Sequence, residues 1–288
     1  MTFDHFLNQA WNDHAENPKI VRDRFAEGLG LIGSDEQVAS MAHLITHVMG
    51  EHLGEWQTGV DWLMRLEHLP AVQEEGLAAI SRSVASLRLA KGQEASLTSL
   101  SRSDQIRACA VAASALCGHQ QITRANELLQ TALGLAESGL PSDDPAHRSL
   151  AATGHNLACT LEEKIDKNPQ EIELMILAAR TSRIYWQIAG TWLEVSRAEY
   201  RLANTYLQAK DLDKAYQSAQ NCLQIAEQNQ APALELFFAY EAQALVEKAR
   251  QRKPEQDIAV AEMKKHFAAL SPEDQKWCEK TLLAFSPA

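Results

Sequence analysis

Three side chains that could share a metal ion recur at steps of four residues in the N-terminal part of the sequence. His43, His47 and Glu51 follow this spacing, and His52 is adjacent to Glu51. Because residues four apart lie on one face of an α-helix, the spacing predicts that the three side chains project in the same direction. Imidazole and carboxylate groups are ligands for zinc. A metal-binding regulator or a metal-dependent enzyme is therefore one hypothesis for this protein.

The apolar residues of the same segment favour a different interpretation. They occupy the other face of the predicted helix, so the histidines lie on its polar side. The sequence has no His-Glu-x-x-His motif, and it offers no visible partner that would orient the imidazoles from behind. We therefore expect solvated groove residues here, with no metal ion and no cofactor. The residues on the apolar face are Val38, Met41, Ala42, Ile45, Val48 and Met49.

Motifs of common enzyme classes are missing from the sequence. There is no Gly-x-Ser-x-Gly elbow, no phosphate-binding loop and no dinucleotide fingerprint. We therefore predict that the protein is not an enzyme. The cysteines form no Cys-x-x-Cys pair, and their apolar surroundings are typical of reduced, buried thiols in a cytoplasmic protein. These five residues are Cys109, Cys117, Cys159, Cys222 and Cys278.

The charge of the chain bears on the class of partner. The formal net charge is −11, which disfavours binding to nucleic acid. Residues 1–70 alone contribute −7 and contain six of the ten histidines. This acidic part would suit a basic partner segment, whose binding should weaken at higher salt.

We predict no secretory signal at the N-terminus and no membrane span, because no apolar run approaches the roughly 20 residues required.

Apolar residues recur at helical spacing over nearly the whole chain. Leu77, Ile80, Val84 and Leu87 follow one another at steps of three and four residues, and strand-like alternation is almost absent. Proline, glycine and capping residues interrupt this pattern at short intervals. The sequence therefore predicts an all-α protein with about fourteen helices, joined mostly by short loops.

One pair of these helices has a recognisable internal pattern. The segment 196–229 has Leu202, Ala203 and Tyr206 in its first helix and Ala215 near the start of its second, with a tight turn at Lys210. Small residues let two helices approach closely, while the larger ones fill the surrounding space. The pattern resembles the tetratricopeptide repeat, a helix–turn–helix unit of 34 residues. Segment 106–139 is a second, weaker match.

The resemblance extends over most of the chain. The small position of the first helix recurs at steps of 35, 32, 45 and 45 residues, at Thr46, Ser81, Ala113, Ala158 and Ala203. It implies a right-handed superhelical stack of antiparallel helix pairs, an α-solenoid. We expect a single domain over residues 1–288, with capping helices at 1–33, repeats at 34–268 and a capping helix at 269–288. An irregular helical bundle is the alternative.

The resemblance also implies a function. In tetratricopeptide proteins the first helices line a concave groove that binds peptides, and some members clamp a C-terminal carboxylate there. Arg197, Arg201 and Asn204 match part of such a clamp, but the companion lysines are missing. We therefore expect a non-catalytic scaffold or adaptor that binds a protein or peptide segment. The repeats at the ends of the array could support a homodimer. The groove residues implied are His43, His47, Glu51, His155, Arg197, Tyr200, Asn204 and Gln208.

Overall fold

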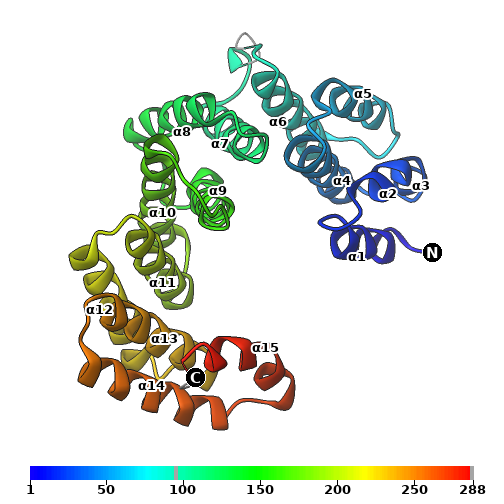
Figure 1. Ribbon diagram of the computed structural model, residues 1–288. Coiled ribbons are helices and arrows are strands. Elements are labelled where there is room, and N and C mark those ends of the chain that lie inside the picture. Colours follow the sequence, from blue (N-terminus) through cyan, green and yellow to red (C-terminus); the bar gives the residue numbers. More distant parts are fainter. Residues whose placement is uncertain (94–96, 286–288) are drawn as a thin grey trace. The chain divides into compact units, whose positions relative to one another are not determined.

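The protein is helical throughout the part of the chain that the structure describes. The structure is a computed structural model, and it describes residues 1–93 and 97–285. Over these residues the chain forms fifteen α-helices and one π-helical segment, with no β-strand (Figure 1). The predicted all-α class, with helices packed in successive pairs as in an α-solenoid, is confirmed. In the same residues no helix combines the length and apolarity that a membrane span requires.

The chain divides into two compact units, residues 1–153 and 154–288. The helix α9 (Pro145–Glu162) contains the division. Unit 1 also comprises α1 (Phe3–Asp13), α2 (Pro18–Asp23), α3 (Phe25–Leu29), α4 (Asp35–His47), the π-helix η1 (Val48–His52), α5 (Trp56–Glu67), α6 (Glu74–Ala90), α7 (Arg102–Gly118) and α8 (Ile122–Glu137). Unit 2 also comprises α10 (Pro169–Ala189), α11 (Trp192–Gln208), α12 (Leu212–Gln228), α13 (Ala233–Ala249), α14 (Lys253–Ala268) and α15 (Pro272–Leu283).

The core of unit 1 joins the first helices to the helices that follow. Phe6 and Phe25 are fully buried and belong to the same apolar cluster as Met41 and Ile45 of α4. Glycine permits part of this contact, because a Cβ atom at Gly28 would lie 2.4 Å from the ring of Phe6. The segment 1–33, predicted to cap the array, thus packs its aromatic side chains directly onto α4 and its neighbours.

In unit 2, small residues bring consecutive helices close together. Ala203 of α11 and Ala215 and Ala219 of α12 are completely buried, and Leu202 and Tyr206 are almost so. Helices α11 and α12 begin and end within a few residues of the pair predicted from the segment 196–229. The helix–turn–helix predicted for this segment is confirmed.

The same turn ends four of the helices. The left-handed residue is Gln120 between α7 and α8, Lys210 between α11 and α12, Gln230 between α12 and α13, and Gln251 between α13 and α14, with φ of 50° to 60°. At each turn the next amide donates to a carbonyl five residues back, as Asp211 N does to Tyr206 O at 2.9 Å. This is the Schellman bond that ends a helix with one left-handed residue. These helices therefore end in the same way whether the turn lies within a helix pair or between successive pairs.

The register predicted for α6 is wrong. Ser81, expected at the small buried position, is exposed, whereas Ser83 and Val84 are buried. The helix α6 packs against α4, α5 and α7, and Ser81 does not lie on the face that these contacts bury. Thr46, Ala113, Ala158 and Ala203 are buried as predicted.

Candidate functional site

Three imidazoles form a cluster in unit 1. His14 follows the end of α1, His47 ends α4, and His52 ends η1. One ring nitrogen from each lies within 4.8 Å of the others. The Nε2 atoms of His47 and His52 are 3.1 Å apart, and all three side chains are half-buried. The sequence separates His14 from the other two by more than thirty residues, so only the packing of α1 brings it to this place.

The π-helix explains why His47 and His52 meet. The amide of Leu53 donates to the carbonyl of Val48 at 3.0 Å, which is the five-residue step of a π-turn. In a regular α-helix of 3.6 residues per turn, residues five apart point in different directions. The wider π-turn brings them to one side. His119 occupies the space beside η1, with its Nε2 2.9 Å from the carbonyl oxygen of Gly50.

Glu51 lies behind His47 rather than beside it. One of its carboxylate oxygens is 3.2 Å from Nδ1 of His47, and the other accepts a hydrogen bond of 3.1 Å from the hydroxyl of Ser114. Burial by itself would raise the pKa of Glu51, but these hydrogen bonds and the neighbouring imidazoles lower it below its usual value. Glu51 is therefore a carboxylate that holds the His47 ring in one orientation.

Two other contacts complete the surroundings of the cluster. Nδ1 of His14 is 2.5 Å from the carbonyl oxygen of Trp11, so this nitrogen carries the proton and Nε2 is left as an acceptor. Burial, followed by the proximity of His47 and His14, lowers the pKa of His52 to about 4. Its ring is consequently neutral at neutral pH, the form that can ligate a metal.

The predicted ligand set is only partly brought together. His47 and Glu51 are in contact, but His43 is exposed and lies outside the cluster, with its ring 5.1 Å from that of Trp11. The residues that cluster with His47 are His14 and His52. The π-helix η1 begins directly after His47 and brings His52 to it, one turn beyond His43, whose ring lies beside Trp11 instead.

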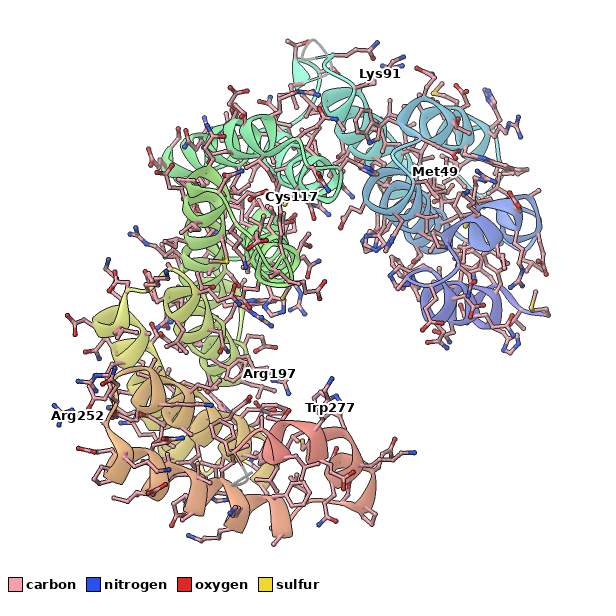
Figure 2. The ribbon with its side chains drawn as sticks, in the orientation of Figure 1. Met49, Lys91, Cys117, Arg197, Arg252 and Trp277 are labelled. Atoms are coloured by element: carbon pink, nitrogen blue, oxygen red, sulfur yellow. The ribbon has the colours of Figure 1, made fainter. Side chains whose placement is uncertain are left out.

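Unit 2 contains a cavity of about 410 Å³. Its apolar lining includes Tyr200 of α11, Phe238 of α13 and Trp277 of α15, whose ring is 66% exposed. The rings of Phe238 and Trp277 are 5.4 Å apart, and that of Tyr200 lies 5.8 Å from Phe238. Figure 2 labels Arg197 and Trp277, two of the polar and aromatic residues at this cavity. The residues that complete the lining are His155, Ser196, Arg201, Cys222, Leu234 and Glu235.

Both arginines of the cavity pair with carboxylates of this chain. Arg197 contacts Glu235, and Arg201 contacts Glu162. In each pair the guanidinium is the more exposed group: the side chain of Arg197 is 58% exposed against 10% for Glu235. Burial first, and then the two arginines, lower the pKa of His155 to about 4, so its imidazole is neutral at neutral pH.

No protein-family model matches the sequence, and no curated protein matches it. A similar solved structure is that of BtubC (BKLC) from P. vanneervenii. The two chains are 14% identical, with a TM-score of 0.47, over 93% of this chain and 92% of that one.

The predicted groove residues of unit 2 fall into two sets. His155, Arg197 and Tyr200 line the cavity together. Asn204 is half-buried and donates to the carbonyl of Tyr200 in its own helix, and Gln208 is exposed; neither belongs to the cavity lining. Sequence reasoning missed Phe238 and Trp277. The sequence contained one indication for Trp277, which is a large aromatic residue in an otherwise polar helix near the C-terminus.

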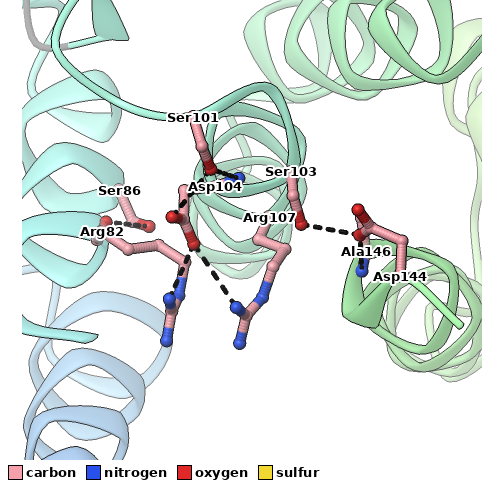
Figure 3. A network of polar contacts seen from close by, with 8 residues as sticks. All are labelled: Arg82, Ser86, Ser101, Ser103, Asp104, Arg107, Asp144 and Ala146. Carbon is pink, nitrogen blue, oxygen red and sulfur yellow. Dashed lines mark hydrogen bonds and ion pairs between the residues drawn. The ribbon is translucent and has the colours of Figure 1, made fainter. Parts of the chain in front are cut away.

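A third polar arrangement links α6 and α7 in unit 1 (Figure 3). Asp104 accepts from Nη1 of Arg82 at 2.8 Å and from Nη1 of Arg107 at 3.4 Å. Its second oxygen accepts from the hydroxyl of Ser101 at 2.9 Å. Burial first, and then Arg82, lower the pKa of Arg107. The carboxylate thus holds together two guanidiniums that would otherwise repel each other, which is a structural role.

Proposed function

We propose that this chain is a non-catalytic, cytoplasmic peptide-binding module, and that the cavity of unit 2 receives an apolar side chain of the bound segment. The observation that carries the proposal is the aromatic lining of this cavity beside an exposed tryptophan. A volume of about 410 Å³ lies in the range of pockets that enclose small ligands, and is ample for one large side chain.

The chemistry of the lining supports a protein partner. Tryptophan, tyrosine and arginine are the residue types most enriched among those that dominate binding energy at protein interfaces, and Trp277, Tyr200 and Arg197 occur together here. Trp277 offers an apolar face that a partner would remove from water. Such burial stabilises a complex by roughly 25 cal/mol for each Å² of apolar surface.

The charges at the cavity suggest what accompanies the apolar side chain. Arg197 is more exposed than its ion-pair partner Glu235, so the guanidinium is the charged group of this pair that a partner could contact. An acidic group next to the apolar side chain of the bound segment would complement the guanidinium of Arg197. A basic segment, as expected from the acidic residues 1–70, would bind in unit 1 instead. The tetratricopeptide resemblance, which implies a groove lined by first helices, agrees with either location.

Selection from a random peptide display library, with the full chain as bait, tests this function. Affinities of the enriched peptides would then be measured by fluorescence polarisation. We expect Trp277→Ala to weaken binding at least tenfold, because it removes an exposed indole from the cavity lining. Its thermal unfolding should stay unchanged, since the ring is 66% exposed.

Gln208→Ala provides the matched control, because Gln208 was assigned to the same groove but does not line the cavity. It should bind as the native chain does. Equal affinity of the Trp277→Ala variant, or failure to enrich any peptide, would argue against this function.

A further inference from the structure

We propose that His14, His47 and His52 form a binding site for a transition-metal ion, and that Zn²⁺ is the ion it fits best. The site lies wholly within unit 1, shares no residue with the unit 2 cavity, and does not depend on the peptide-binding function. Three imidazoles with one coordination position left for water are a common donor set for zinc.

The spacing of the three nitrogens fits a small ion. With Zn–N bonds of about 2.0–2.1 Å, two nitrogens of a tetrahedral site are about 3.3 Å apart. The Nε2 atoms of His47 and His52 are already 3.1 Å apart, and the nitrogen of His14 completes the set within 4.8 Å. A modest movement of the His14 ring would bring all three to bonding distance.

The groups behind the ligands orient the rings for this role. Nδ1 of His47 faces the carboxylate of Glu51 at 3.2 Å, and Nδ1 of His14 faces the carbonyl oxygen of Trp11 at 2.5 Å. Each contact keeps a proton on Nδ1 and directs the lone pair of Nε2 into the cluster. A carboxylate or carbonyl on the far nitrogen is the usual companion of a metal-bound histidine. Solvated histidines on a helix surface would not require these partners.

Proton balance is simple at this site. Without metal, the 3.1 Å contact requires a proton on one of the two Nε2 atoms. In a neutral ring that proton shifts to Nδ1 when Nε2 binds the ion, so no net proton is released and both Nε2 lone pairs then bind the metal. The negative charge of Glu51 remains beside His47 and offsets part of the charge that the ion introduces.

The site would also link separate elements. His14 follows α1, whereas His47 and His52 flank η1, so a bound ion joins the N-terminal helix to α4 and η1. A ligand that binds only the folded state raises the unfolding temperature in proportion to the logarithm of its concentration. Zinc should therefore stabilise the protein against thermal unfolding.

Calorimetric titration with zinc chloride tests the site, using the full chain without a histidine tag and after dialysis against a chelator. We expect one equivalent of Zn²⁺ to bind. His14→Gln and His52→Gln should each weaken binding at least tenfold. Glu51→Gln should weaken it about 10–100-fold through the orientation of His47. Circular dichroism of each variant, which should match the native spectrum, establishes that the loss is local.

His43→Gln is the matched control, because His43 lies one turn before His47 on the same helix but outside the cluster. It should keep the native stoichiometry and affinity. The ring of Trp11 is within 5.3 Å of those of His14, His43 and His47, so Cu²⁺, which quenches nearby indoles, should lower tryptophan fluorescence in the native chain and much less in Trp11→Phe. Absence of zinc binding, or equal losses in His43→Gln and His14→Gln, would overturn the proposal.

Discussion

The hydroxyl of Tyr200 in α11 donates a hydrogen bond of 2.8 Å to the carboxylate of Glu241 in α13. Glu241 is only 9% exposed, and burial raises its pKa although the tyrosine partly offsets this. Burial, followed by the charge of Glu241, also raises the pKa of Tyr200. Tyr200 therefore both lines the cavity and satisfies a buried carboxylate, which couples the cavity wall to the packing of α11 on α13.

Tyr200→Phe should destabilise the protein by about 1–3 kcal/mol, because it leaves the carboxylate of Glu241 buried without its donor. Glu241→Gln should cost less, since an amide oxygen can still accept from the phenol. Urea unfolding of both variants measures the difference. The opposite order of the two losses would show that the charge, and not the missing donor, sets the cost.

Two glycine-to-alanine substitutions should have opposite signs. A Cβ atom at Gly154 would lie 2.6 Å from the carbonyl oxygen of Ala178 and 2.8 Å from the amide of Ser182. Because both are backbone atoms, Gly154→Ala should cost about 1–3 kcal/mol. Gly134 in α8 has open space around it, so Gly134→Ala should stabilise the helix by about 0.5–1 kcal/mol.

Thermal unfolding followed by circular dichroism measures the change in stability of both variants, and each variant serves as the control for the other. A stabilising Gly154→Ala would mean that α9 and α10 are farther apart than the structure shows.

His155 should make the stability of the protein sensitive to acid. Its pKa is about 4 in the folded state and near 6.5 when unfolded, so the unfolded chain binds an extra proton between these values. The folded state is thus progressively disfavoured as the pH falls from about 6.5 to 4. His155→Gln should remove this contribution. Urea unfolding at several pH values should show the variant gaining stability relative to the native chain as the pH is lowered, and a constant difference would contradict the assignment.

Asp104→Asn should destabilise the contact between α6 and α7. The substitution removes the charge that Arg82 and Arg107 share, and leaves two half-buried guanidiniums close together. We expect a loss of about 1–3 kcal/mol, in the range for a charged hydrogen-bond partner removed. Arg107→Gln is the comparison, because it leaves Asp104 paired with Arg82 and should cost less. Equal losses in urea unfolding would mean that the repulsion is already screened by solvent.

The helices of this protein were largely readable from the sequence, because what forms them is local. Apolar spacing defines the buried face of each helix, and capping residues such as Ser34 and Thr191 bond the amides that follow them. The pair α11–α12 was predicted closely because its buried alanines lie within 34 residues of one another.

The arrangement of the chemical groups was decided by the tertiary structure. A periodicity of four could not reveal the π-helix at Val48–His52, since inserting one extra residue into a turn depends on what packs against it, here His119 and α7. His14 and Trp277 reach their places only through the packing of terminal helices. The sequence by itself determined which helices form and which faces are apolar. Only the fold decided which polar side chains meet, because such contacts join residues far apart in the chain.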